Sequence, residues 1–482
     1  MQLVEQGKLK LDVPVSTYLP EYPKTNGDLI TIHHLLTHTS GTPNMTSFRS
    51  FGNVKRNSYT PVQLVSMSAD STLEFKPGEK FAYSNSGYIL LGYIIEKVSG
   101  KSYEQMLQEN IFTPLQMKNT GYDHGSTLLK NRASGYERSG SHYVNADYID
   151  MSVPYAAGSM YSTVEDLYLW NQALYAGTLL QKGNMDLMFA KHIAVGGNSF
   201  YGYGWGVGDI TIGSSPDRIF TVGHGGSIDG FNTQITRIPS DKTIIVLLNN
   251  TGGAPLNEIT SSIAAIIYDK SFNPPKRSVA YSMAEQMEKE GVQAAGKYYN
   301  RIKDSTGYYL DEQEMNTTGY EFLRSGRLEE AAVTFELNTK AFPKSWNTYD
   351  SYGEALMAKG DKAAAIDNYK RSVKLNPGNE GGIKFLKDNG VNTDDLIVKV
   401  PVEQLKLLEG DYQSLDDKNW TIQFNVLDGI LYGNDRGYKY RVLPVGEGAF
   451  VNPDDGASLV FDSKDKAAIT MTLFEKLKFK KK

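Results

Sequence analysis

The sequence predicts an α+β protein of several domains, in which a large mixed domain precedes a helical repeat segment and a small all-β domain. Helical and strand patterns alternate with glycine-rich turns over residues 1–272, as expected of one mixed domain. A set of residue types then recurs at a constant interval within 311–392, and short alternating strands fill 400–482. At 482 residues the chain is also too long for one ordinary core.

The composition is typical of a globular protein and excludes several function classes. Hydrophobic residues make up 40% and charged residues 22% of the chain. Because 50 basic and 55 acidic residues leave a net charge of only −5, we expect no nucleic-acid partner. Apolar runs such as Ile244 to Leu248 have only the length of one buried strand, so we expect no transmembrane segment. The lack of cysteine excludes disulfides, thiol catalysis and cysteine-ligated zinc, and we expect no cofactor.

The N-terminus has the pattern of the end of a helix. In "MQLVEQGKL" the apolar residues Met1, Leu3, Val4 and Leu9 surround Gly7, a residue type that ends helices. The basic region and apolar stretch of a signal peptide do not occur here. We therefore expect the chain to open within an element, and the residues themselves leave its compartment open.

Two helices and two strands of the first domain have clear signals. Ser102 with Gln105, and Ser162 with Glu165, fit the capping box, in which side chains bind the free amides of the first turn. In "YGYGWGVG", residues 201–208, glycine at every second position predicts a strand with one bare face rather than a phosphate loop. Further on, "KTIIVLLNN" predicts a buried strand, and "ITSSIAAIIYD" predicts a helix packed on it.

Residues 273–310 predict a linker and a possible degenerate helical unit, and residues 311–392 predict tetratricopeptide-like repeats. Five pairs of matching residue types lie 34 positions apart, the period of that repeat. Small residues would let paired helices approach, and the aromatic residue would fill the space between them. Such repeats bind proteins or peptides, and a rigid spacer is the alternative. The pairs are Gly319 and Gly353, Gly326 and Gly360, Ala331 and Ala365, Phe335 and Tyr369, and Pro343 and Pro377.

Residues 400–482 predict a small antiparallel β domain or barrel. "WTIQFNVLDGILYG" alternates on both sides of Asp428 and Gly429, which is the signal of a type I′ hairpin. "AITMTLFEKLKFKKK" alternates up to the C-terminus. We interpret its lysines as charges that keep a solvated strand edge from pairing, and contact with an anionic surface is the alternative.

Three stretches of the first domain together resemble one enzyme family. They are "ITIHHLLTHTSGTP" (30–43), "FKPGEKFAYSNSGYILLGYIIEKVSG" (75–100) and "VGHGGSIDGF" (222–231). In order and spacing they resemble the serine β-lactamases and penicillin-binding proteins, in particular class C β-lactamase-like esterases and D-aminopeptidase-like hydrolases. The resemblance covers roughly the first 270 residues. It implies a β-lactamase/transpeptidase-like antiparallel sheet with helices, incomplete at the N-terminus, and a cell-envelope or secreted location.

The resemblance also implies the site residues. Tyr83 and Asn85 match the family's Tyr-x-Asn, and His224 with Gly226 matches its Lys- or His-x-Gly on a strand. A tyrosine can take the proton of an attacking serine, and a carboxamide can orient the substrate, so we expect Tyr83, Asn85 and His224 to be catalytic. Gly226 would let substrate approach the backbone, and the amide of Ser227 would bind the oxyanion.

The family's first element, Ser-x-x-Lys at a helix start, is missing from its place. The one such pattern, Ser463 with Lys466, lies in a polar turn of the last domain, where we interpret it as coincidence. Ser84 and Ser227 lie within motifs but lack a lysine at the required spacing. We therefore expect a truncated serine hydrolase that is inactive as it stands. The alternative is a non-catalytic scaffold that combines a dead hydrolase fold with helical repeats.

Three further features of the first domain bear on metal binding, on the substrate and on a possible cleft. His34 and His38 are four apart, as in half of a zinc site, but no ligand with suitable spacing follows, so we expect no metal. Histidine in place of lysine at position 224 weakens the positive charge that would hold a β-lactam carboxylate. Esters or D-amino-acid peptides are thus favoured as substrates. Trp205 and its neighbouring tyrosines could line a cleft, although aromatic residues in strands more often belong to the core.

Overall fold

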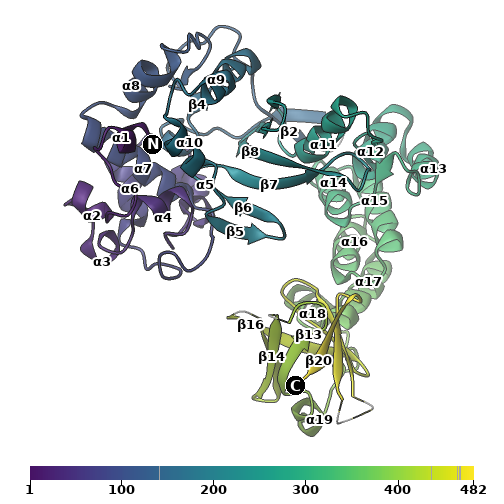
Figure 1. Ribbon diagram of the computed structural model, residues 1–482. Coiled ribbons are helices and arrows are strands. Elements are labelled where there is room, and N and C mark those ends of the chain that lie inside the picture. Colours follow the sequence, from purple (N-terminus) through teal and green to yellow (C-terminus); the bar gives the residue numbers. More distant parts are fainter. Residues whose placement is uncertain (140–141, 419, 436, 464, 466–467) are drawn as a thin grey trace. The chain divides into compact units, whose positions relative to one another are not determined.

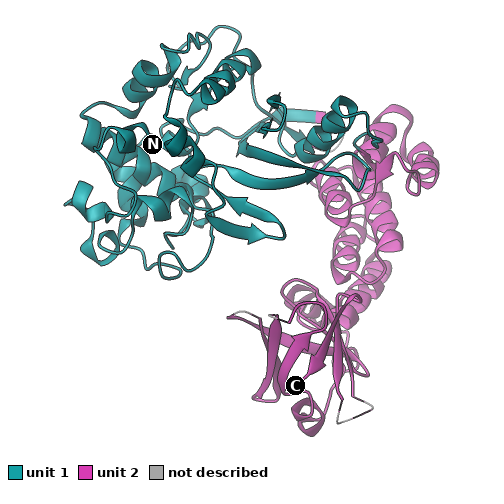
Figure 2. Ribbon diagram, in the orientation of Figure 1, with its two compact units in different colours: residues 1–138, 143–275 teal, residues 139–142, 276–482 magenta. Residues whose placement is uncertain are grey.

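The computed structural model describes residues 1–139, 142–418, 420–435, 437–463, 465 and 468–482 (Figure 1). These residues form two compact units (Figure 2). Unit 1 comprises Met1–Arg138 and Tyr143–Pro275, and unit 2 comprises Ser139–His142 and Lys276–Lys482. Each unit buries apolar clusters of its own. The main division falls within the exposed, proline-bearing segment "SFNPPKRS".

A six-stranded antiparallel sheet is the framework of unit 1. Its strand order, β10-β9-β8-β7-β6-β5, follows the order of the chain, so consecutive strands form hairpins. This sheet with surrounding helices confirms the predicted α+β class. The strands are β5 (Ile193–Gly196), β6 (Ser199–Tyr201), β7 (Gly206–Thr211), β8 (Arg218–Ile228), β9 (Phe231–Ile238) and β10 (Thr243–Asn249).

The helices of unit 1 bury their apolar sides against one another and on the sheet. Helix α7 (Asn85–Ser99) is the longest, buries Ile89, Leu90 and Ile94, and ends at Gly100 in the left-handed conformation. Helix α11 (Leu256–Ile267) packs Ala264 and Ala265 with Ile245 of β10, which confirms the predicted pairing of helix and strand. The other helices are α1 (Gln2–Glu5), α2 (Val15–Tyr18), α3 (Lys24–Gly27), α4 (Ile32–Leu36), η1 (Met45–Ser47), α5 (Phe51–Val54), α6 (Pro61–Ala69), α8 (Tyr103–Leu107), η2 (Gln108–Phe112), η3 (Tyr155–Ala157), α9 (Val164–Ala176) and α10 (Lys182–Met188). Shorter strands are β1 (Gly121–Tyr122), β2 (Tyr136–Ser139), β3 (His142–Asn145) and β4 (Met160–Tyr161).

Of the two predicted helix caps, one is confirmed and one is shifted by a residue. Ser102 and Gln105 form the capping box at α8. At α9 the N-cap is Thr163, whose hydroxyl accepts from the amide of Asp166 at 3.3 Å, so the prediction of Ser162 was wrong. The carboxylate of Asp166 accepts instead from the backbone of Asn119, which ties the helix start to an earlier loop.

The run "YGYGWGVG" is a hairpin rather than the single strand predicted for it. Strand β6 ends at Tyr201 and β7 begins at Gly206. Between them the amide of Gly202 donates to the carbonyl of Trp205 at 2.7 Å, and Gly204 has a φ of +77°. This conformation suits glycine, so the glycine spacing that suggested a strand belongs to a tight turn.

The helical segment of unit 2 consists of consecutive helix pairs. Its helices are α12 (Val279–Glu290), α13 (Val292–Ile302), α14 (Glu312–Arg324), α15 (Leu328–Ala341), α16 (Trp346–Ala358), α17 (Lys362–Leu375) and α18 (Glu380–Asp388), with β11 (Arg277–Ser278) and β12 (Tyr308–Tyr309) near their start. Helices α16 and α17 begin and end 34 residues after α14 and α15. A Cβ at Gly319 would lie 2.6 Å from the ring of Phe335, and one at Gly353 would lie 2.9 Å from that of Tyr369. The two helix pairs therefore repeat the same close contact.

The rest of unit 2 is a closed barrel of eight antiparallel strands. They are β13 (Gly410–Ser414), β14 (Thr421–Leu427), β15 (Ile430–Asp435), β16 (Tyr438–Gly446), β17 (Ala449–Val451), β18 (Ser458–Asp462), β19 (Thr470–Leu473) and β20 (Leu477–Lys481), preceded by α19 (Val402–Lys406). Asp428 and Gly429 both have positive φ between β14 and β15, which confirms the type I′ hairpin. Strand β20 pairs with both β19 and β13, so the predicted free edge was wrong because the barrel closes there.

Candidate active site

Tyr83 and Asn85 lie where a loop enters α7. The backbone amide and the side-chain amide of Asn85 both donate to Oδ1 of Asn44, at 3.2 and 3.4 Å. The side chain of Tyr83 is 45% exposed, and its hydroxyl makes no hydrogen bond within the described part of the chain. The loop thus holds the carboxamide in place and leaves the phenol free to meet a ligand.

His224, Gly226 and Ser227 lie near the end of β8. Strand β7 pairs with β8 only up to Gly223, so among the described residues β8 continues past it with one edge open. His224 is half-buried, whereas the residues from Gly225 to Ser227 are exposed. The sequence-predicted substrate-binding residues therefore lie on an accessible stretch of strand.

The structure brings Tyr83 and His224 side by side. Their ring centroids are 6.2 Å apart, with an angle of 35° between the planes. Asn85 is two residues from Tyr83 at the start of α7. The two family motifs thus meet at one place, although they lie far apart in the chain.

Two residues that the sequence reasoning did not place in the site connect its halves. His38 accepts at Nδ1 from the amide of Ser84 at 3.1 Å, and its Nε2 lies 3.2 Å from the hydroxyl of Tyr201. That hydroxyl lies 2.8 Å from Nε2 of His224. The sequence suggests His38 only as half of a metal pair, and Tyr201 only as a cleft or core aromatic residue. The sequence offers one signal for these two residues: His38 and Tyr201 each lie in a stretch with a distinctive residue pattern.

Burial keeps these groups neutral. Burial, with a smaller effect from nearby His224, lowers the pKa of His38 to about 3. Burial also lowers the pKa of His224 below its usual range. It raises the pKa of the Tyr83 phenol, so a phenolate there needs a cation beside it. At neutral pH the described site is therefore uncharged at these three side chains.

Gly226 is confined by the neighbouring strand. A Cβ at this position would lie 2.4 Å from Oγ1 of Thr233, its partner on β9. Its φ is not in the left-handed region, so the need for glycine comes from packing rather than from backbone conformation. The prediction that Gly226 admits substrate remains a prediction.

The histidine pair considered for zinc is used in hydrogen bonds. Nδ1 of His34 accepts from the amide of Thr31 in a capping box. Both ring nitrogens of His38 have the partners given above. The described ranges contain no group of three or more histidine, aspartate or glutamate side chains that could hold a metal.

The three serines that are candidate nucleophiles differ in exposure. Ser84 is 2% exposed, and its hydroxyl has no hydrogen-bond partner among the described residues. Ser227 is exposed at the open edge of β8. Ser463 is exposed in the loop after β18, and Lys466 lies outside the described residues.

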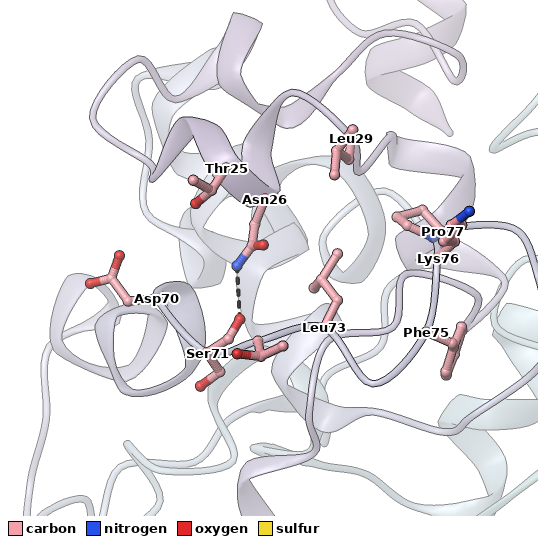
Figure 3. Close-up of a pocket in the computed structure, with 10 residues that line it drawn as sticks. Thr25, Asn26, Leu29, Asp70, Ser71, Leu73, Phe75, Lys76 and Pro77 are labelled. Carbon is pink, nitrogen blue, oxygen red and sulfur yellow. Dashed lines mark hydrogen bonds between the residues drawn. The ribbon is translucent and has the colours of Figure 1, made fainter. Parts of the chain in front are cut away.

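A separate hollow lies on another part of unit 1 (Figure 3). The side chain of Asn26 spans it by donating to the carbonyls of Ala69 and Ser71, at 2.8 and 3.0 Å. No residue predicted for the active site lines it. Its lining consists of Thr25, Asn26, Leu29, Asp70, Ser71, Thr72, Leu73, Phe75, Lys76 and Pro77.

No helix of the described residues combines the length and apolar character needed to cross a bilayer.

The chain is similar to penicillin-binding proteins over its first half. It is 34% identical over 269 residues to the putative penicillin-binding protein PbpX of Bacillus subtilis, a match that covers 55% of this chain and 62% of that protein. It is 30% identical over 293 residues to penicillin-binding protein 4* of the same organism, covering 57% and 63%. The chain thus spans less than two thirds of the length of these curated relatives.

A solved structure and a family model also match the N-terminal part of the chain. The D-stereospecific amidohydrolase from Streptomyces sp. matches with a TM-score of 0.50 and 26% identity, over 56% of this chain and 82% of that one. The family model described as Beta-lactamase matches residues 1–266, more than half of the chain. The match includes all three stretches of the resemblance, two of which carry Tyr83, Asn85 and His224. This protein therefore belongs to the β-lactamase family.

Proposed function

We propose that Tyr83, Asn85, His224, Gly226 and Ser227 form the acyl-transfer site of a serine hydrolase that acts on D-amino-acid amides, peptides or esters. The contact between the rings of Tyr83 and His224, beside the open edge of β8, is the observation that carries the proposal. Membership of the β-lactamase family supports it.

Each residue has a chemical role in this proposal. In a form that contains the Ser-x-x-Lys, the serine hydroxyl attacks the substrate carbonyl while Tyr83, as a phenolate stabilised by the lysine ammonium, accepts its proton. Tyr83 then gives that proton to the leaving amine or alcohol as the acyl bond breaks. The carboxamide of Asn85, held by Asn44, orients the substrate amide. His224 lines the same wall as a neutral group.

The backbone of Ser227 suits the oxyanion role. Ile228 and Phe231 flank a two-residue turn between β8 and β9, and in antiparallel hairpins the residues with hydrogen bonds across the pair alternate. The amide of Ser227 therefore points away from β9, towards the edge that β7 leaves open. A donor at such a position contributes roughly 3 kcal/mol to lowering the barrier.

The neutral state of His224 favours substrates without an obligatory carboxylate. A lysine at this position would carry a permanent positive charge, whereas the lowered pKa of His224 leaves it uncharged at neutral pH. The similarity to a D-stereospecific amidohydrolase supports D-amino-acid amides in particular. We therefore expect these compounds and simple esters to be preferred to β-lactams.

The 482 residues contain no Ser-x-x-Lys in the family's place, so we propose that they do not form an acyl-enzyme by themselves. Intact-mass spectrometry after incubation with a fluorophosphonate or benzylpenicillin tests this, and we expect no adduct. An adduct on a serine of unit 1 would refute the proposed inactivity. For any longer form that contains a Ser-x-x-Lys we expect labelling that Tyr83→Phe reduces at least tenfold, and unchanged labelling would remove Tyr83 from the mechanism.

We also propose that α14 to α17 are two tetratricopeptide units that present a surface to a protein or peptide. The 34-residue offset of the helix bounds and the repeated glycine-aromatic contacts support this assignment. Within the same proposal the domains are 1–272, 273–310, 311–392 and 400–482.

A further inference from the structure

We propose that His38 and Tyr201 are positioning residues of the candidate active site. They connect the loop of Tyr83 to His224 through a single chain of hydrogen bonds that runs from the amide of Ser84 to the carbonyl of Gly225. This chain, called the His38–Tyr201–His224 chain below, fixes which nitrogen of each histidine carries the proton. Its meaning for catalysis rests on the proposed function, but its geometry does not.

The direction of the chain is set at its first end. The backbone amide of Ser84 can only donate, so Nδ1 of His38, 3.1 Å away, must be the acceptor. A neutral imidazole with a lone pair on Nδ1 carries its proton on Nε2. His38 therefore donates from Nε2 to the hydroxyl oxygen of Tyr201, at 3.2 Å.

The other end sets the same direction independently. The carbonyl of Gly225 can only accept, so Nδ1 of His224, 2.6 Å away, must carry a proton. The lone pair of the neutral ring then lies on Nε2. Tyr201 therefore donates its hydroxyl proton to His224, at 2.8 Å. The hydroxyl of Tyr201 accepts on one side and donates on the other, which a single hydroxyl can do.

His38 is held tightly at the centre of this arrangement. Its ring lies against the rings of both Tyr83 and Tyr88, with centroids 4.1 and 4.8 Å away. Only 2% of the residue is exposed, and its φ of 54° lies in the left-handed region, which is costly for a histidine. Burial favours the neutral forms of both histidines, which the chain requires. His38 thus sets the position of the Tyr83 ring by contact and that of His224 through Tyr201.

The chain leaves His224 no free nitrogen. Nδ1 is used by Gly225 and Nε2 by Tyr201, so His224 cannot take a proton from Tyr83 without breaking the chain. In the proposed reaction His224 therefore shapes the wall beside Tyr83 and does not act as its base.

Nitrogen NMR of the ligand-free protein tests the chain. The sequence has only seven histidines, so protein labelled with ¹⁵N-histidine gives few signals, which His38→Gln and His224→Gln assign. The test variant is Tyr201→Phe, which removes only the hydroxyl. The matched control is Tyr203→Phe, because the hydroxyl of Tyr203 contacts Nδ1 of a different histidine, His33, at 2.9 Å.

We expect His38 to be protonated on Nε2 and His224 on Nδ1 in the unaltered protein. Tyr201→Phe should shift the Nε2 signals of both and leave His33 unchanged. Tyr203→Phe should shift His33 and His192, on which the ring of Tyr203 stacks, and leave His38 and His224 unchanged. Protonation of His224 on Nε2, or Nε2 signals that ignore Tyr201→Phe, would overturn the proposal. The tautomers of His38 and His224 are read from the unaltered protein, with only the variants His38→Gln and His224→Gln needed for assignment. The test therefore stands even if Tyr201→Phe fails to fold. Because no substrate is added, an error in the proposed function would leave this result unaffected.

Discussion

His38 lies at the point where the loop of Tyr83 and the strand of His224 meet. It contacts the first through its ring and the second through Tyr201. A buried neutral histidine at such a point makes the folded state sensitive to acid, because protonation would place an unpaired charge inside the protein. The residue therefore couples the geometry of the site to the stability of the fold.

The first prediction concerns this acid sensitivity. The unfolded chain binds a proton at His38 near pH 6.5, whereas the folded chain does so only near pH 3. Between these values the unfolded state binds more protons, so the free energy of unfolding falls as the pH is lowered. We expect His38→Gln to reduce this fall by up to about 1.4 kcal/mol per pH unit between pH 6 and pH 4.

Urea denaturation followed by tryptophan fluorescence measures the effect in a protein whose tryptophans all lie in unit 1. Replacing Trp346 and Trp420 by phenylalanine leaves Trp170 and Trp205, both in unit 1, as the tryptophan reporters. The control is His124→Gln, which alters an exposed histidine of unit 1. Equal pH dependence in His38→Gln and the parent protein would contradict the assignment of His38 as the sensitive group.

At this scale, sequence patterns predict part of the candidate site. Tyr83, Asn85 and His224 follow from two short motifs, and the structure brings Tyr83 and His224 together. The sequence does not indicate the contacts of His38 and Tyr201, because these are hydrogen bonds between segments distant in the chain. Such contacts leave no periodic pattern for a reader of the sequence to find.

At the scale of elements, predictions from local residue patterns are correct for the hairpin turn of the barrel. They are wrong where contact with a distant segment of the chain decides the structure. Asp428 and Gly429 made the hairpin that their residue types require. The cap of α9 moved to Thr163, and the carboxylate of Asp166 binds the distant backbone of Asn119. The lysine-rich β20 has no free edge, because β13 closes the barrel against it.

The second prediction tests why glycine occurs in the helix pairs of unit 2. Alanine at Gly353 would place its Cβ 2.9 Å from the ring of Tyr369, whereas alanine at Gly296 of α13 would meet nothing within 4 Å. We expect Gly353→Ala to destabilise unit 2 by about 1–3 kcal/mol through overpacking. The control Gly296→Ala should instead stabilise it by up to about 1 kcal/mol, because alanine favours helix.

Thermal denaturation followed by circular dichroism at 222 nm compares the two variants, since this signal reports on helix. The double variant Gly353→Ala with Tyr369→Leu should recover part of the loss, because a smaller side chain admits the methyl group. If Gly353→Ala and Gly296→Ala shift the transition equally and in the same direction, close packing is not the reason for glycine.

At the scale of the whole molecule the chain divides into two units that bury separate cores. The segment between them is exposed from Asp269 to Arg277 and contains two consecutive prolines. The proposed chemistry follows this division, because every residue proposed to take part in it belongs to unit 1. The family match also ends before this segment, at residue 266.

The third prediction is that trypsin cuts first at Lys276. This residue is exposed and lies outside any helix or strand, which are the properties that favour cleavage. Limited digestion followed by mass spectrometry should give two fragments that resist further cutting. Early cleavage inside α14 to α17 or inside the six-stranded sheet would show that the units are less independent than the separate cores imply.

The account as a whole depends on Tyr83, Asn85 and His224 forming one binding wall, and a titration of ¹⁵N-histidine-labelled protein with D-phenylalanine amide tests this most directly. We predict a saturable shift of the His224 signals, weakened several-fold by Asn85→Ala, with the exposed His142 unmoved. The claim of one binding wall would be contradicted if only other histidines showed saturable shifts. It would also be contradicted if His224 did not shift at concentrations that saturate the binding measured by calorimetry.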